Sequence, residues 1–220
     1  MPLILMLGVA LLAGVVLTVA WYCYFARSNR RRATQVMHWV ERVFGGHGRV
    51  ADLVWESASQ FRVRMELVTA MFHRATLVVQ LFPRQHPLSW LIKRIRGQAE
   101  TLTFEADLDS APSFNLEVHN YRWYGRSRRR LASEPHHWDL HQTSPFVLTT
   151  RNDWQREITS MMNALVASRE CDCSCVSFRR SSPHFSATVP LEIMAPSLPH
   201  QPEIFDMLRE LAAGASTARF

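Results

Sequence analysis

An N-terminal apolar run is the feature that most constrains this chain. Residues 1–26 contain no charged side chain, and almost every residue from Leu3 to Ala20 is apolar. About 20 such residues span the hydrocarbon core of a bilayer. Aromatic residues suited to a membrane–water boundary follow directly: Trp21, Tyr22, Tyr24 and Phe25. The run therefore predicts a transmembrane anchor over residues 1–26 and a single-pass membrane protein.

The distribution of arginine predicts the orientation of this anchor. No Lys or Arg precedes the apolar run, whereas four arginines follow it closely: Arg27, Arg30, Arg31 and Arg32. Basic residues beside a membrane helix favour the cytoplasmic side, so we expect the C-terminal domain in the cytoplasm. A cleaved secretory signal is the alternative, but such a signal begins with a basic segment and has a shorter apolar core. An uncleaved signal-anchor is therefore the preferred interpretation.

The basic character of the chain is local. The sequence has 25 basic and 19 acidic residues, and the two classes nearly balance once the four arginines beside the anchor are set aside. A balance of this kind does not indicate nucleic acid as a partner. The four arginines instead predict contact with anionic lipid headgroups, because each basic residue near such a surface contributes about 1 kcal/mol of binding free energy.

The rest of the chain predicts one folded domain. Residues 27–48 are expected to form a basic juxtamembrane segment, with a short helix over 34–44 that continues from the membrane and stops at Gly45 and Gly46. Residues 49–220 are long enough for one soluble domain with a single hydrophobic core. Its pattern predicts the α+β class, with a mostly antiparallel sheet and helices that cover one face.

Period-2 alternation of apolar and polar residues predicts the strands. They are expected at residues 61–67, 75–81, 102–108, 114–118, 175–178 and 185–191, with short fragments on either side of Pro145. Helical spacing of apolar residues predicts helices at 87–96, 150–166 and 203–213. Strands in sequential pairs with short turns indicate antiparallel pairing, and the strands at 102–108 and 114–118 are expected to form a hairpin.

Three closely spaced cysteines form the first candidate site: Cys171, Cys173 and Cys175. Thiolates bind zinc, copper(I) and iron–sulfur clusters. The spacing is narrower than that of the usual zinc motifs, however, and there is no second pair elsewhere. In a strand all three side chains would point to one face, where they would form part of an ordinary core. The structural interpretation is therefore preferred, and a metal or redox role is the alternative.

The second candidate is a row of two histidines and a carboxylate: His137, Asp139 and His141. In an extended strand the three project to the same side, and this ligand set suits iron or zinc. Successive members are about 7 Å apart at their Cα atoms, so only adjacent members converge on one ion. A polar face of an edge strand is the simpler interpretation, and we predict no cofactor.

The third candidate is an arginine-rich segment with aromatic neighbours, at residues 121–130. Its later arginines are Arg126, Arg128, Arg129 and Arg130. The segment suits a solvated loop, anionic lipid headgroups, or a nucleic acid or protein partner. Because the anchor already places the domain beside a membrane, lipid is a better partner than nucleic acid.

The motifs of common enzymes do not occur in the sequence. We find no Gly-rich phosphate loop, no nucleophile elbow and no His-Glu-x-x-His metal motif. The sequence therefore favours a non-enzymatic interaction or scaffold domain held at the cytoplasmic membrane surface, with a protein partner that it does not identify. The alternative is a membrane-bound metal-binding or redox protein that uses the three cysteines or the histidine row.

Overall fold

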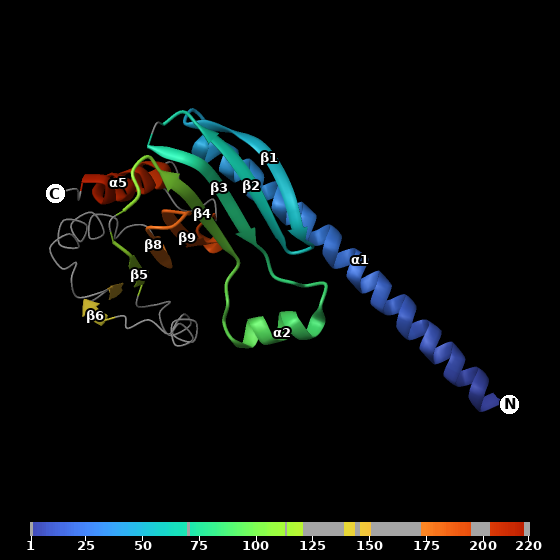
Figure 1. Cartoon of the computed structure of the whole chain (residues 1–220). Helices are drawn as coiled ribbons and strands as arrows, with labels where there is room; N and C mark the ends of the chain where they lie inside the picture. The colour runs from blue at the N-terminus through green and yellow to red at the C-terminus, as the bar shows by residue number, and fades with distance from the viewer. Residues whose placement is uncertain are drawn as a thin grey trace.

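A long N-terminal helix precedes one large sheet in the computed structural model of the chain (Figure 1). The structure describes residues 2–69, 71–112, 114–120, 139–143, 146–150, 173–194 and 203–217. Its elements, in chain order, are α1 (Pro2–Phe44), β1 (Gly48–Ser57), β2 (Gln60–Leu67), β3 (Phe72–Gln80), α2 (Pro87–Ile95), β4 (Thr101–Leu108), β5 (Leu116–Asn120), β6 (Asp139–Thr143), β7 (Phe146–Thr150), β8 (Cys175–Phe178), β9 (Phe185–Pro190), the 3-10 helix η3 (Leu191–Met194) and α5 (Glu203–Thr217). The predicted α+β class is confirmed.

The strands of the described residues form one sheet, in the order β1-β2-β3-β4-β9-β8-β5-β7-β6. Every pair of neighbours is antiparallel, as predicted. The predicted hairpin of β4 with β5 is wrong, because the β8–β9 hairpin lies between these two strands. Both strands of that hairpin carry buried apolar side chains, for example Phe178 and Phe185. The later hairpin therefore suits the centre of the sheet, where β4 and β5 would otherwise have met.

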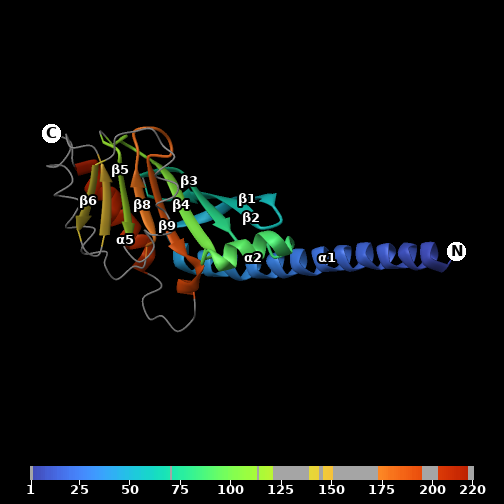
Figure 2. The same cartoon turned by 90° about the horizontal axis from the view of Figure 1, so that it is seen from below.

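Helix α1 is continuous over 43 residues, about 65 Å at 1.5 Å per residue. From residue 4 to residue 24 its side chains are exposed, and this part is long and apolar enough to cross a membrane. The second half is buried along one side, as Val36 and Val40 show. The helix expected at 34–44 thus continues from the apolar run, as predicted, and ends at Phe44 before two glycines. Figure 2 shows the first half projecting from the domain as a straight rod.

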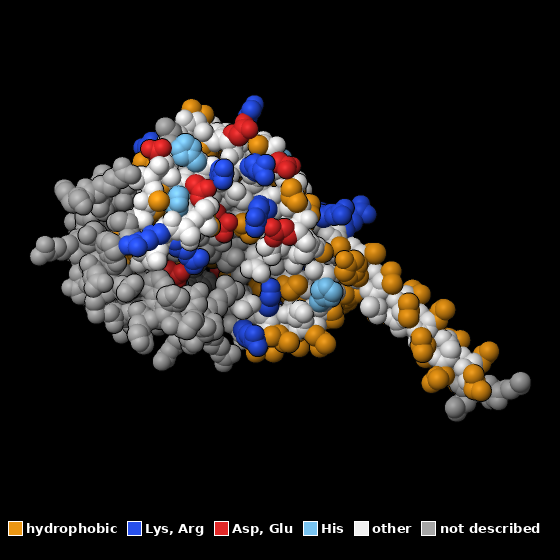
Figure 3. Space-filling view, viewed as in Figure 1, with side chains coloured by type: hydrophobic (Ala, Val, Ile, Leu, Met, Phe, Trp, Pro, Cys, Tyr) orange, Lys and Arg blue, Asp and Glu red, His pale blue; other side chains and the backbone are white. Residues whose placement is uncertain are grey.

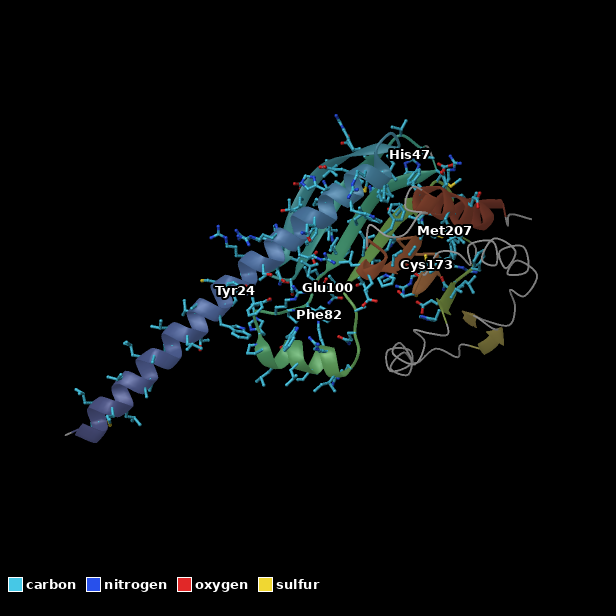
Figure 4. The ribbon with its side chains drawn as sticks, turned by 180° about the vertical axis from the view of Figure 1, so that it is seen from behind. Tyr24, His47, Phe82, Glu100, Cys173 and Met207 are labelled. Atoms are coloured by element: carbon cyan, nitrogen blue, oxygen red, sulfur yellow. The ribbon has the colours of Figure 1, made fainter. Side chains whose placement is uncertain are left out.

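The core lies between one face of the sheet and two helices, the second half of α1 and α5 (Figure 4). Aromatic rings join these layers. The ring of Phe44 in α1 lies 6.1 Å from that of Phe104 in β4 and 5.4 Å from that of Phe205 in α5. Phe104 also contacts Phe72 at 5.3 Å. Helices at the start and end of the chain therefore cover one face, as predicted, whereas the helix expected at 150–166 lies outside the described residues after Thr150.

Polar contacts hold α1 against the edge of the sheet. Asn29 is fully buried, and its Nδ2 lies 3.2 Å from the Ala58 carbonyl oxygen, 3.1 Å from that of Phe82 and 3.2 Å from Gln85 Oε1. One turn further along, Arg32 Nε lies 3.7 Å from Oε2 of the buried Glu100. The other oxygen of that carboxylate accepts a hydrogen bond from the backbone N–H of Phe82 (Figure 4). The helix and the domain are therefore one structural unit.

Candidate functional site

Among the described residues, α1 and α5 cover one face of the sheet and no helix packs over the opposite face, which we call the open face; Figure 3 views the molecule from this side. Successive side chains of a strand point to opposite sides, so residues that alternate with the buried apolar positions lie on the open face. In the central strands these are hydroxyl, thiol and titratable side chains: Thr101, Thr103, Glu117, His119, Cys175, Ser177, Ser186 and Thr188. The open face therefore carries polar and titratable side chains, whereas the covered face carries the apolar side chains of the core.

A cleft of about 770 Å³ lies over this part of the sheet. Its floor is formed by β4, β9, β8 and β5. Helix α2 closes one side with Ser89, Ile92, Lys93 and Arg96. The volume lies within the range of small-molecule sites in proteins, about 300–1,000 Å³.

Four side chains from neighbouring strands form the centre of the cleft. The register places His119 of β5 directly opposite Cys175 of β8. Glu117, two residues before His119, lies on the same side of β5. Its Oε1 accepts a hydrogen bond of 2.8 Å from Nη2 of Arg179, and its Oε2 lies 3.6 Å from Nε2 of His119. A carboxylate thus bridges a guanidinium and an imidazole, and a thiol faces that imidazole.

The environment of this cluster sets its charge. Burial alone would lower the pKa of His119, but its interactions with the Cys175 and Glu117 side chains outweigh burial and raise the pKa to about 9. The pKa of Glu117 is lowered, mainly by its interaction with His119 and against the effect of burial, with a further contribution from Arg179. At neutral pH His119 is therefore an imidazolium and Glu117 a carboxylate.

The cleft as a whole is cationic. Among the described residues that line it, the positive groups are Lys93, Arg96, Arg179 and protonated His119, whereas Glu117 is the one acidic side chain. Hydroxyl groups from Thr103, Ser186 and Thr188 add neutral donors on the floor. Guanidinium, ammonium and hydroxyl groups together suit phosphate or carboxylate oxygens. The arrangement can therefore bind an anionic group.

Glu117 and His119 belong to no sequence motif. In the sequence they are polar residues of an alternating strand, and only the order of the sheet brings them beside Cys175 and Arg179. No known family model matches the chain, and no characterised protein shows significant sequence similarity to it. The cleft is therefore interpreted from its own chemistry.

The predicted cysteine cluster is divided between the two faces of the sheet. Cys171 lies outside the described residues. Cys173 packs against the hydrophobic core (Figure 4), whereas Cys175 lines the cleft on the open face. The common face expected for three cysteines in one strand does not apply here, because β8 begins only at Cys175. Ahead of it, the N–H and Oγ of Ser174 both donate to the carbonyl oxygen of Thr188, so Cys173 does not follow the alternation of the strand.

The other predicted sites are described only in part. His137 lies outside the described residues, while Asp139 and His141 stand in β6, paired with Thr150 and Leu148 of β7. Within the described part of the chain, no group of three His, Cys, Asp or Glu side chains is placed to hold a metal ion. The segment with Arg126, Arg128, Arg129 and Arg130 also lies outside it.

The four arginines beside the apolar run differ in their surroundings. Arg27, Arg30 and Arg31 are exposed. Arg32 is half-exposed and forms the ion pair with Glu100. Three of the four are therefore oriented toward solvent, whereas the fourth helps to fix α1 to the domain.

Proposed function

We propose that this protein is a single-pass membrane-anchored binding protein whose domain lies at the cytoplasmic membrane surface. Residues 1–26 span the bilayer, 27–48 follow it as the juxtamembrane part, and 49–220 form the soluble domain. The exposed apolar half of α1 supports the anchor. The positive-inside rule supports the orientation, because Arg27, Arg30 and Arg31 remain exposed at the end of the apolar run.

The ligand that this function requires is an anionic group, most simply a phosphate. The cationic cleft is the observation that carries the proposal, since among its described lining residues a buried imidazolium at His119 and the guanidinium of Arg179 meet one carboxylate, that of Glu117. Binding without chemistry suits an interaction or scaffold domain held at the membrane. The phosphate belongs either to a lipid headgroup or to a soluble compound, and both place the same charge in the cleft.

Thermal stability of the full chain in phosphatidylcholine nanodiscs tests this proposal. Inorganic phosphate should raise the unfolding temperature, because a ligand at 100 times its Kd stabilises the folded state by about 2.7 kcal/mol. His119→Gln should abolish the rise. Arg49→Gln is the matched control, since Arg49 is an exposed arginine of β1 paired with Glu66 and does not line the cleft.

Two outcomes separate the sources of the phosphate. If nanodiscs with a phosphoinositide stabilise the wild type but not His119→Gln, the ligand is a lipid headgroup. If free phosphate alone stabilises it, the ligand is soluble. No stabilisation by either probe, or equal stabilisation of His119→Gln, would contradict the anion-binding function.

A second function is favoured by the contact between Cys175 and His119. A thiol opposite a buried imidazolium, with Glu117 as a third group, is the arrangement of a cysteine nucleophile. In that reaction Cys175 first loses its proton to solvent and forms a thiolate beside the His119 imidazolium; the thiolate attacks an acyl carbonyl, and His119 donates its own proton to the leaving group. Alkylation of Cys175 by iodoacetamide tests it: the rate at pH 7 should fall in His119→Gln. An equal rate in both proteins would exclude an activated thiolate.

The metal-binding alternative and the lipid contacts of the arginine-rich segment are tested separately. Elemental analysis of the full chain, purified without chelator, should find stoichiometric zinc, iron or copper if Cys171, Cys173 and Cys175 or the row of His137, Asp139 and His141 bind metal. Replacing Arg126, Arg128, Arg129 and Arg130 by glutamine should weaken binding to anionic lipid if that segment contacts headgroups.

A further inference from the structure

Helix α2 exposes the face that a helix normally buries. Leu88 and Ile95 are each 76% exposed, Leu91 is 46% exposed and Ile92 48%. Their spacing of three and four residues places them on one side of the helix. Helix α2 has no buried residue, although a stripe of this kind usually packs against a core.

The position of α2 is fixed by contacts with α1. The indole N–H of Trp21 donates a hydrogen bond of 3.2 Å to the carbonyl oxygen of Arg84, and the ring of Tyr22 lies 6.2 Å from that of His86. Residues 84 and 86 directly precede α2. Figure 1 shows α2 at an oblique angle to α1, and Figures 1 and 2 both place it at the end of the domain from which the apolar half of α1 projects. The exposed stripe therefore lies at the level of the aromatic residues of α1.

The polar side of α2 carries basic residues. Lys93, Arg94 and Arg96 follow the stripe, and the guanidinium of Arg94 lies over the ring of Trp90, 5.4 Å from its centre. Helix α2 itself contains no acidic residue. An apolar stripe flanked by Trp and basic residues is the pattern of helices that lie in the plane of a membrane interface.

We infer that α2 lies in the headgroup region of the bilayer that α1 crosses, with Leu88, Leu91 and Ile95 directed into the lipid and Ile92 at the boundary with the cleft. This inference rests on the proposed anchoring by α1. Two points of attachment then fix the tilt of the domain. Ser89, Lys93 and Arg96 of α2 line the cleft, so the cleft opens beside the headgroups of anionic lipids.

Site-specific fluorescence in the full chain tests the inference. An environment-sensitive fluorescent amino acid is placed at Ile95, at Val9 in α1, or at Val68, and the protein is reconstituted in vesicles of phosphatidylcholine and phosphatidylserine. Val68 is the matched control because it is an 84% exposed apolar residue. It lies at the far end of the domain, where its backbone N–H donates to the carbonyl oxygen of His47 (Figure 4). Brominated lipids should quench the probes at Ile95 and Val9 but not the probe at Val68.

The outcomes distinguish the placement of α2 from the anchoring by α1. Quenching at Val9 without quenching at Ile95 overturns the placement of α2 and leaves the anchor intact. No quenching at Val9 overturns the anchor, and the placement of α2 with it. A probe at Ile95 that neither brominated lipid nor aqueous iodide quenches means that protein covers the stripe, which also overturns the inference.

A charged variant gives an independent measurement. Leu88→Glu with Ile95→Glu should remove the lipid quenching of a probe at Leu91, whereas Val68→Glu should leave it unchanged. The substituted side chains are exposed, so the unfolding temperature of each variant in detergent should match that of the parent protein. Retained quenching at Leu91 in the double variant would contradict the inference.

Discussion

Replacing Asn29 by alanine should separate α1 from the domain more than any other single polar substitution in this helix. The change removes the donor that lies within 3.2 Å of the Ala58 and Phe82 carbonyl oxygens and of Gln85 Oε1. A buried polar group that loses its partner costs about 1–3 kcal/mol. Water can reach the Ala58 and Phe82 carbonyls, because both residues are only partly buried, and the Phe82 carbonyl also accepts a hydrogen bond from the backbone N–H of Arg84. Gln85 is the buried partner that loses its donor, so we expect the free energy of unfolding to fall by about 1–3 kcal/mol.

Urea unfolding of the full chain in detergent micelles, followed by tryptophan fluorescence, measures this change. Thr34→Ala is the control, since the Thr34 hydroxyl donates only to the carbonyl of Arg30 in the same helix and is exposed. It should change the unfolding free energy by less than about 0.5 kcal/mol. A double-mutant cycle with Gln85→Ala should show coupling of at least about 0.5 kcal/mol. An Asn29→Ala effect no larger than that of the control would refute the role given to Asn29.

Three further predictions follow from the charge and packing of the described residues. The pKa of His119 is raised from 6.5 to about 9, so its protonation should stabilise the fold by roughly 3 kcal/mol below pH 6.5. This stability should be lost as the pH rises through 9. Urea unfolding at pH 6 and pH 9.5 should show the loss in the wild type and much less of it in His119→Gln. Phe104→Ala should lower the unfolding free energy by about 3–5 kcal/mol, because the buried ring of Phe104 contacts those of Phe44, Phe72 and Phe185. Val54→Ala on the exposed strand β1 is the control and should change the unfolding free energy by less than about 0.5 kcal/mol. The anchor should reverse its orientation when Arg27, Arg30 and Arg31 are replaced by glutamine and three arginines are inserted before Leu3. Protease protection of the domain in sealed vesicles would detect the reversal. An unchanged cleavage pattern would argue against orientation by these arginines.

The elements with regular periodicity were predicted from the sequence because their burial follows the same period. Phe61, Val63 and Met65 alternate with exposed residues in β2 as expected. Strand β1 was not predicted, and its side chains explain why: it is an exposed edge strand with irregular register on both sides of Leu53. No buried face imposes an alternating pattern there.

The candidate site was predictable only in fragments. Cys175 belongs to a visible cluster of cysteines in the sequence, but Glu117, His119 and Arg179 belong to no local motif. They meet because β8 pairs with β5, a pairing set by the order of the whole sheet. Sequence spacing reports neighbours along a strand or helix, whereas this cluster depends on contacts between residues about sixty positions apart, such as Glu117 and Arg179.

Because α1 runs unbroken from its exposed half into the core, it would act as a rigid arm between the domain and the bilayer of the proposed anchor. Each residue inserted near Ser28 would lengthen the arm by about 1.5 Å and turn the domain by about 100° around it. A single insertion would therefore rotate the cleft around the axis of α1. Seven inserted residues would nearly restore its rotational position and move the domain about 10 Å further from the apolar half of the helix. Without a hinge, any tilt that bilayer thickness imposes on the helix passes directly to the domain. The distance of the cleft from the bilayer and the direction in which it faces therefore depend on the length and rotational phase of α1, together with the attachment inferred for α2.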